Sequence, residues 1–83
     1  MIKLANFDRD KRELIIQASS KNSGGYNLTR LLVARQQCDG VINVVIIGNG
    51  ATKVHSTIAK EIEVLNKFTS SDYSKEFNFS LRT

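Results

Sequence analysis

The clearest hydrophobic pattern lies in the middle of the chain. Val41–Ile47 is a run of branched apolar residues with one polar interruption at Asn43, which is typical of a buried strand. The turn Gly48–Ala51 follows, and its glycines allow a strand to reverse quickly into a helix. From Thr52 to Phe68, apolar residues recur at spacings of four, four and three, which predicts one buried helical face. This face consists of Val54, Ile58, Ile62 and Leu65.

Two shorter segments at the start of the chain have the pattern of strands. Met1–Phe7 alternates apolar and polar residues, as an edge strand does, although it could equally be a loose arm. Asp8–Arg12 is a dense charged cluster that predicts an exposed turn, and Glu13–Ala18 predicts a second strand. The two strands could pair as a hairpin, although the turn lacks the Asn-Gly or Asp-Gly dipeptide that favours one.

A polar loop and a helix separate this second strand from the central one. Ser19–Gly25 is rich in hydrogen-bond donors, and Asn27 is the predicted N-cap of a helix that ends at Gln37. Gly40 is the expected left-handed residue that stops this helix.

The end of the chain alternates again over Tyr73–Leu81, which predicts a final strand. Phe77 and Phe79 share one side of this strand, and we expect them to be buried rather than free to stack on bases.

The order of elements predicts one small α/β (α+β) domain that spans residues 1–83. Residues 1–12 form an edge strand or arm, 13–68 a βαβα core, and 73–81 the final strand. Because helical crossovers join the main strands, these strands should be parallel with right-handed connections. The residues expected to be buried are Val44, Ile46, Val54, Ile58, Ile62 and Leu65.

The composition of the chain indicates its cellular compartment and a weak preference for anionic partners. The 41% apolar and 24% charged content is ordinary for a soluble domain. A net charge of +4 and a pI near 9.5 favour an anionic partner such as nucleic acid, although many small basic proteins bind none. Cys38 is the single cysteine, so an internal disulfide is excluded. With no signal-peptide pattern and no apolar run of roughly 18 residues, we expect a cytoplasmic chain without a membrane partner.

The two glycine-bearing loops are the best candidates for a binding site. In a parallel sheet, Ser19–Gly25 and Gly48–Ala51 fall at the carboxyl ends of adjacent strands, and each opens a helix N-terminus that favours an anion. Lys21 lies in the first loop, and Lys53 lies one turn into the second helix. These features predict contact with phosphate or a nucleic-acid backbone. The alternative is that the glycines merely close turns and the lysines are solvated.

Two segments of the chain resemble a known family. Leu14–Ser23 and Val44–Ala51, each followed by a helix, resemble the stage V sporulation protein S family. They are also similar to the wider Alba-type group of nucleic-acid-binding proteins and to the C-terminal fold of translation initiation factor three. The resemblance implies a βαβα core closed by further strands, a homodimer, and contact with DNA or RNA. The implied contact residues are Ser20, Lys21 and Asn22 in the first loop, and Asn49, Gly50 and Lys53 in the second.

The chain also departs from that pattern. The first loop has one lysine where relatives carry more basic charge, and Asn49 stands where many have arginine. The C-terminal segment has room for one strand instead of a hairpin. The segment 1–12 either takes the place of the missing strand or supplies a basic contact through Arg9, Lys11 and Arg12.

Candidates for catalytic chemistry are few. His55 has no cysteine or paired carboxylate beside it, Cys38 has no nearby histidine, and Glu61 and Glu63 face different sides of the helix. Gly48–Gly50 is not a dinucleotide-binding fingerprint, because the third glycine and the later acidic residue are missing. We therefore expect a protein that is not an enzyme and uses no cofactor or metal.

The sequence leaves two function classes open. The first is a non-enzymatic nucleic-acid-binding protein that contacts phosphates through the two strand-to-helix loops. The second is a small protein-interaction regulator or inhibitor that keeps the fold without nucleic-acid binding. The lysines spaced by seven, Lys53, Lys60 and Lys67, fit either a phosphate-tracking ridge or an ordinary solvated flank. In both classes Val64 and Phe68 flank the apolar stripe and suggest a homodimer.

Overall fold

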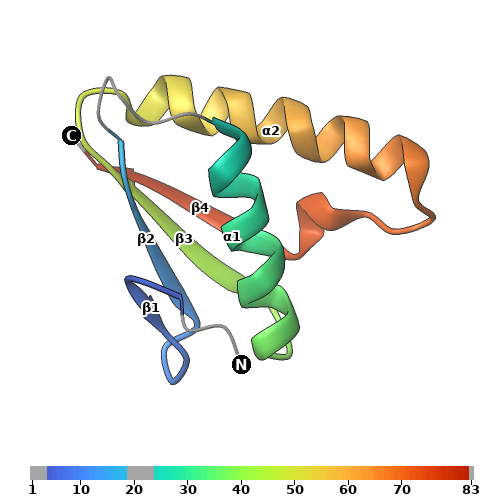
Figure 1. The fold of residues 1–83 in the computed structure, drawn as a ribbon, viewed down its shortest axis with the longest axis horizontal. Helices are drawn as coiled ribbons and strands as arrows, with labels where there is room; N and C mark the ends of the chain where they lie inside the picture. Colours follow the sequence, from blue (N-terminus) through green and yellow to red (C-terminus); the bar gives the residue numbers. More distant parts are fainter. Residues whose placement is uncertain (1–3, 19–23, 83) are drawn as a thin grey trace.

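The computed structural model describes residues 4–18 and 24–82 and contains seven elements (Figure 1). In chain order they are β1 (Phe7–Asp8), β2 (Glu13–Gln17), α1 (Gly24–Gln37), β3 (Ile42–Ile47), α2 (Ala51–Phe68), the 3-10 helix η1 (Tyr73–Lys75) and β4 (Phe77–Arg82). This order confirms the predicted small α+β domain with a βαβα core. Among the described residues, no helix is long and apolar enough to cross a membrane.

The strands form one four-stranded mixed sheet in the order β1-β2-β3-β4. β1 and β2 pair antiparallel as a hairpin, with Phe7 opposite Leu14. β2 pairs with β3 and β3 with β4 in parallel, which confirms the predicted crossovers. Leu14, Val44 and Phe79 lie in one row across the three main strands.

Both long helices cover the same face of this sheet. The core is a single cluster in which buried residues of α1 and α2 pack on alternate strand residues. Its members are Leu14, Ile16, Ala18, Leu31, Ala34, Ile42, Val44, Ile46, Ala51, Val54, Ile58, Ile62 and Phe77. Val45 is buried yet lies outside this cluster, because successive side chains of a strand point to opposite faces. The molecule therefore has two layers, with helices on one face of the sheet only.

The start of the chain differs from the predicted edge strand over Met1–Phe7. β1 is only two residues long, and residues 1–3 lie outside the described part. Asn6 has a left-handed backbone, with φ 60°, so the regular strand begins only at Phe7, although the Asn6 carbonyl already accepts a hydrogen bond from the Ile15 N–H at 3.0 Å. The predicted turn also starts later, because Asp8 belongs to β1 and its carboxylate accepts hydrogen bonds from the backbone N–H of Asp10 and Lys11.

Two predictions about helix residues were wrong. Asn27 is not an N-cap, because α1 begins at Gly24 and Asn27 is buried inside the helix at 3% exposure. Glycine destabilises the interior of a helix, but it is tolerated in the first turn, where the backbone N–H groups have no intrahelical acceptors. Leu65 is half-buried instead of buried, because a surface groove between α1 and α2 opens over it.

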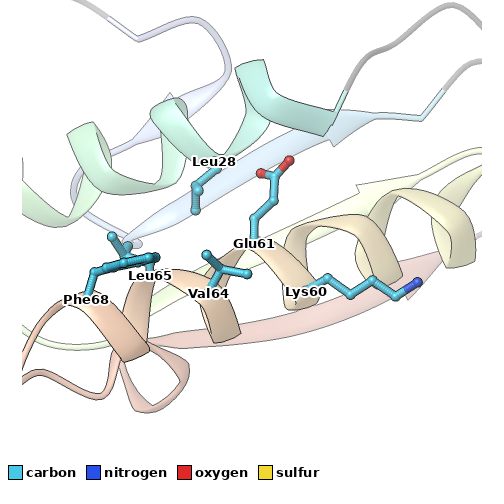
Figure 2. Close-up of a pocket in the computed structure, with 6 residues that line it drawn as sticks. All are labelled: Leu28, Lys60, Glu61, Val64, Leu65 and Phe68. Carbon is cyan, nitrogen blue, oxygen red and sulfur yellow. The ribbon is translucent and has the colours of Figure 1, made fainter.

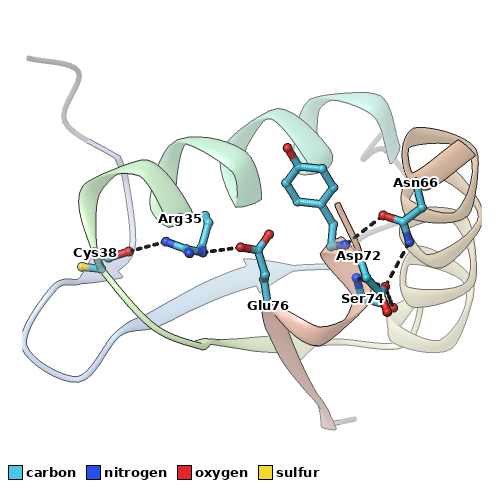
Figure 3. Close-up of polar contacts among 7 residues, drawn as sticks. Arg35, Cys38, Asn66, Asp72, Ser74 and Glu76 are labelled. Carbon is cyan, nitrogen blue, oxygen red and sulfur yellow. Dashed lines mark hydrogen bonds and ion pairs between the residues drawn. The ribbon is translucent and has the colours of Figure 1, made fainter. Parts of the chain in front are cut away.

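The final strand is shorter than predicted, because Tyr73–Lys75 forms η1. Asp72 caps this turn by accepting a hydrogen bond from the Ser74 N–H at 3.2 Å, and the Tyr73 N–H donates to the Asn66 side chain at 2.8 Å (Figure 3). β4 then begins at Phe77, which is buried as expected, whereas Phe79 is only half-buried.

Candidate nucleic-acid interface at the carboxyl edge of the sheet

The ends of the three parallel strands meet at one edge of the sheet. The Ala18 N–H donates to the Ile47 carbonyl at 2.7 Å, and the Gly48 N–H donates to the Arg82 carbonyl at 2.8 Å. These bonds align the carboxyl ends of β2, β3 and β4 at one edge of the sheet. Both α1 and α2 begin at this side of the molecule (Figure 1). We call this region the carboxyl edge; its described members are Ala18, Gly48, Asn49, Gly50, Lys53 and Arg82.

Gly48 is the residue that makes this edge compact. Its φ is +124°, and a Cβ built on it would lie 2.5 Å from the Ala18 carbonyl oxygen. No side chain fits at that distance, so the position requires glycine. At Gly50 a Cβ would lie 3.5 Å from the same oxygen, an ordinary contact, with φ −90°. Sequence reasoning chose Gly50 as a site residue, whereas the structural requirement for glycine falls on Gly48.

In the described part of the chain, the N-terminus of α2 has no side-chain cap. Gly50 is the N-cap and makes no side-chain cap hydrogen bond, and the first turn contains no acidic residue. The Ala51 N–H is bonded to the Gly48 carbonyl at 3.1 Å, and the Val54 N–H to the Gly50 carbonyl at 2.9 Å. In a helix the N–H groups between these two have no intrahelical acceptor, and the helix dipole adds partial positive charge there.

The acidic side chains all lie away from the carboxyl edge. Lys53 and Arg82 are exposed at the carboxyl edge. Six of the eight carboxylates flank the opposite, amino ends of the strands, and the other two lie midway along α2. The six near the amino ends are Asp8, Asp10, Glu13, Asp39, Asp72 and Glu76, and the two on α2 are Glu61 and Glu63. The carboxyl edge therefore has basic side chains without an acidic side chain to neutralise them.

The structure places only half of the predicted contact residues. Asn49, Gly50 and Lys53 come together at the carboxyl edge, and Asn49 and Lys53 are exposed. The other three, Ser20, Lys21 and Asn22, lie outside the described residues. Arg82 was missed, because the predicted strand ended one residue before it. Its parallel register opposite Ile47 is what brings it to this edge.

Five other basic residues that the sequence singled out, and that the structure describes, lie away from this edge. Lys60 and Lys67 are exposed further along α2. Arg9, Lys11 and Arg12 flank the amino end of β2, where the Arg9 guanidinium donates to the Gln37 carbonyl at 3.3 Å. These N-terminal side chains are therefore remote from the carboxyl edge and do not extend it.

The amino ends of the strands are closed by side-chain contacts. The Arg35 Nε forms an ion pair with Glu76 Oε1 at 2.8 Å, and its Nη1 donates to the Cys38 carbonyl at 3.1 Å (Figure 3). Cys38 is half-buried, and its thiol lies 3.7 Å from the Arg9 carbonyl oxygen. These contacts join the end of α1 to the start of β4, which is a structural role.

Few groups in the described part of the chain are arranged for catalysis or metal binding. The His55 ring packs edge-on against Phe79, with centroids 4.9 Å apart, which fixes it as a packing residue. Within residues 4–18 and 24–82, no group of three or more His, Cys, Asp or Glu side chains could hold a metal ion.

A second surface feature is a groove of about 420 Å³ between α1 and α2 (Figure 2). It is lined by Leu28, Lys60, Glu61, Val64, Leu65 and Phe68. Phe68 is 83% exposed and Val64 is 51% exposed, so α2 presents apolar side chains to solvent here. Glu61 Oε2 is buried and has no hydrogen-bond partner.

Comparison of the chain with family models, with curated proteins and with solved structures gives no match.

Proposed function

We propose that this protein binds nucleic acid without catalysing a reaction, and that the carboxyl edge contacts the phosphate backbone. The observation that carries the proposal is the combination of an open α2 N-terminus with exposed Lys53 and Arg82, at an edge that contains no acidic side chain. A helix N-terminus with nearby cations is a favourable environment for a phosphate.

The chemistry is that of backbone recognition. The Gly48–Gly50 turn offers little side-chain bulk, so a phosphate can approach the peptide groups closely. Lys53 and Arg82 add Coulomb attraction, and the exposed Asn49 amide adds a hydrogen-bond donor. Such contacts fix position on a strand and carry no sequence information. The expected binding is therefore salt-dependent and tolerant of sequence, for DNA or RNA.

The test is a titration with labelled single- and double-stranded oligonucleotides of DNA and RNA, at salt concentrations from about 50 to about 200 mM. Lys53→Gln and Arg82→Gln should each weaken binding and lower the slope of log K against log salt by about one, because each lost contact releases about one counterion fewer. Lys67→Gln is the matched control, since it removes the same charge from the other end of α2. Absence of salt-dependent binding to any of these oligonucleotides at the lowest salt would overturn the proposal.

The groove between α1 and α2 favours a second candidate, a protein-interaction regulator. Exposed Phe68 and Val64 supply apolar contact, and Glu61 Oε2 lacks a donor. An unpaired buried acceptor costs roughly 1–3 kcal/mol, which a basic side chain from a partner would offset. The proposed occupant is an amphipathic helix of another protein, with a lysine or arginine among its apolar residues.

A pair of synthetic helical peptides tests this second candidate by fluorescence anisotropy. One carries leucines at i and i+4 with an arginine between them, and the other has glutamate in place of the arginine. We expect binding of the arginine peptide only, and loss of binding with Phe68→Ala. Val41→Ala is the control, because Val41 is also exposed, at 47%, but is not a groove residue. Equal affinity for both peptides would contradict the role of Glu61.

A further inference from the structure

The outer side of β4 carries a row of outward-pointing backbone groups. β4 is the last strand of the sheet, and no described strand pairs with its other side. The Ile42 N–H donates to the Glu76 carbonyl at 3.0 Å, and the Gly48 N–H donates to the Arg82 carbonyl at 2.8 Å. In a parallel ladder alternate residues of a strand face the same neighbour. The even-numbered residues 76–82 therefore face β3, and the backbone N–H and C=O of Phe77, Phe79 and Leu81 point away from it.

The two edges of the sheet differ in how they are protected. The β1 edge is two residues long and runs into the charged turn that begins at Asp8, and both features discourage pairing with another chain. The β4 edge is six residues long, contains no proline or lysine, and keeps an uninterrupted register with β3. Its only charge is Arg82, at the last position. A long, regular edge with low charge is a template for another strand.

We propose that β4 pairs in antiparallel fashion with β4 of a second copy of this chain, about a two-fold axis at Phe79. In this register Phe79 lies opposite Phe79 of the second copy, and Phe77 lies opposite Leu81. All three outward-pointing residues then face one another, and each such pair exchanges two backbone hydrogen bonds. The two sheets become one continuous sheet of eight strands, twice the four of one chain.

The side chains of β4 suit this self-pairing. Leu81 is 40% exposed and Phe79 is half-buried on the helix-covered face, so both gain apolar contact from the second copy. On the open face Asn78 lies opposite Ser80, and these side chains can hydrogen-bond across the pair. No like charges face each other in this register. Self-complementarity of this kind is the requirement for a two-fold interface, and it favours a second copy over a strand of an unrelated protein.

This surface differs from the one that the sequence suggested for a dimer. Val64 and Phe68 lie at the groove that α1 and α2 share, whereas the β4 edge is a backbone surface at the end of the sheet. The inference also does not depend on nucleic-acid binding, because it uses none of the residues proposed to contact phosphate except the terminal Arg82.

The first measurement is mass by sedimentation and light scattering over a range of protein concentrations. We expect a concentration-dependent shift from the 9.3 kDa of one chain toward twice that mass. Leu81→Lys should weaken the dimer at least about tenfold, because it places a charge opposite the apolar Phe77 of the second copy, once on each side of the two-fold axis. Val41→Lys is the matched control: Val41 has similar exposure, at 47%, and lies just before β3, on the side of β4 that is already paired, so the dimer should stay intact.

A backbone variant separates strand pairing from side-chain contact. Leu81→Pro removes an N–H that points outward and leaves every bond to β3 in place, so the fold should tolerate it while the dimer weakens. If this variant does not fold, Leu81→Lys still tests the interface. Phe68→Lys tests the other surface, and loss of the dimer in this variant alone would overturn the proposal.

Amide hydrogen exchange gives the sharpest readout. The N–H groups of Phe77, Phe79 and Leu81 should exchange quickly at low protein concentration and slowly at high concentration. Those of Asn78 and Ser80 should be protected at both, because they face β3. A chain that stays monomeric at high concentration, or a dimer without this alternating change in protection, would show that β4 does not pair with itself.

Discussion

The two ends of the parallel strands use their polar groups in opposite ways. At the amino ends, carboxylates are engaged by neighbouring groups of the same chain, as in the Arg35–Glu76 ion pair at 2.8 Å and the cap that Asp72 forms on η1. At the carboxyl edge, the turn is built from backbone and glycine, and Lys53 and Arg82 stay exposed. The difference indicates that side-chain contacts hold the fold together at the amino ends, whereas in the described part of the carboxyl edge the basic side chains make no such contacts and face solvent.

The largest effect is expected at the turn of the carboxyl edge. Gly48→Ala places a Cβ 2.5 Å from the Ala18 carbonyl oxygen at φ +124°. Relief of this clash requires a shift of β2 or β3, so the free energy of unfolding should fall by ~2–4 kcal/mol. Denaturant unfolding measures it. Gly50→Ala is the control and should change stability by less than about 1 kcal/mol, because its backbone suits an L residue.

The amino ends should be more sensitive than the carboxyl edge to the loss of a charged side chain. Arg35→Met breaks the ion pair with Glu76, whose side chains are 32% and 28% exposed, and leaves a carboxylate that is already short of donors, since Glu76 Oε2 is buried without a partner. We expect a loss of roughly 1–2 kcal/mol in unfolding free energy, with oligonucleotide affinity unchanged. An equal loss for Arg82→Met would mean that both ends are structural.

A charge reversal at Lys53 should separate stability from binding. Lys53→Glu places a carboxylate at the first turn of α2, where the helix dipole favours it, and should raise the unfolding free energy by about 0.5 kcal/mol. The same variant should bind nucleic acid more weakly than Lys53→Gln, because repulsion adds to the lost contact. Lys67→Glu, at the last turn, should instead lower stability. Thermal melts and oligonucleotide titrations on the three variants would expose any coupling between the two properties.

The smallest expected effect is a change in stability at acidic pH. Hydrogen bonding from Ser74 holds the pKa of Asp72 below its usual value of 3.8. Because the pKa of Asp72 is lower in the folded than in the unfolded state, its ionised carboxylate stabilises the fold above the unfolded pKa. This stabilisation is lost as the pH falls through the folded pKa. The melting temperature of the wild type should therefore exceed that of Asp72→Ala near pH 6, and the gap should narrow below about pH 4. A gap that is constant across this range would contradict the assignment.

A dimer paired through β4, with its two-fold axis at Phe79, would contain two carboxyl edges. Antiparallel β4 strands place Arg82 of one copy near the amino end of the other, so the two edges would lie at opposite ends of the eight-stranded sheet. A nucleic acid that contacts both would have to span that sheet. Binding by a monomeric Leu81→Lys variant would show that one edge is sufficient.

Local patterns in the sequence determined the elements and their order. The spacing of Val54, Ile58 and Ile62 predicted α2, and the apolar run before Gly48 predicted β3. The helical crossovers predicted parallel pairing, and parallel pairing in turn predicted that Asn49, Gly50 and Lys53 lie at one edge of the sheet. These successes share a cause, since periodicity within a segment reports which side of that segment is buried.

Several features depend on residues distant in the chain and follow from tertiary packing alone. Gly48 is restricted by the carbonyl of Ala18, and Arg82 reaches the site through its register with β3. The Arg35–Glu76 contact joins positions 41 residues apart. The burial of Asn27 and the half-exposure of Leu65 likewise depend on how α1 lies against its neighbours. A sequence pattern reports which side of a segment is apolar, whereas these contacts depend on how close separate segments approach, which is set by the packing of the whole core.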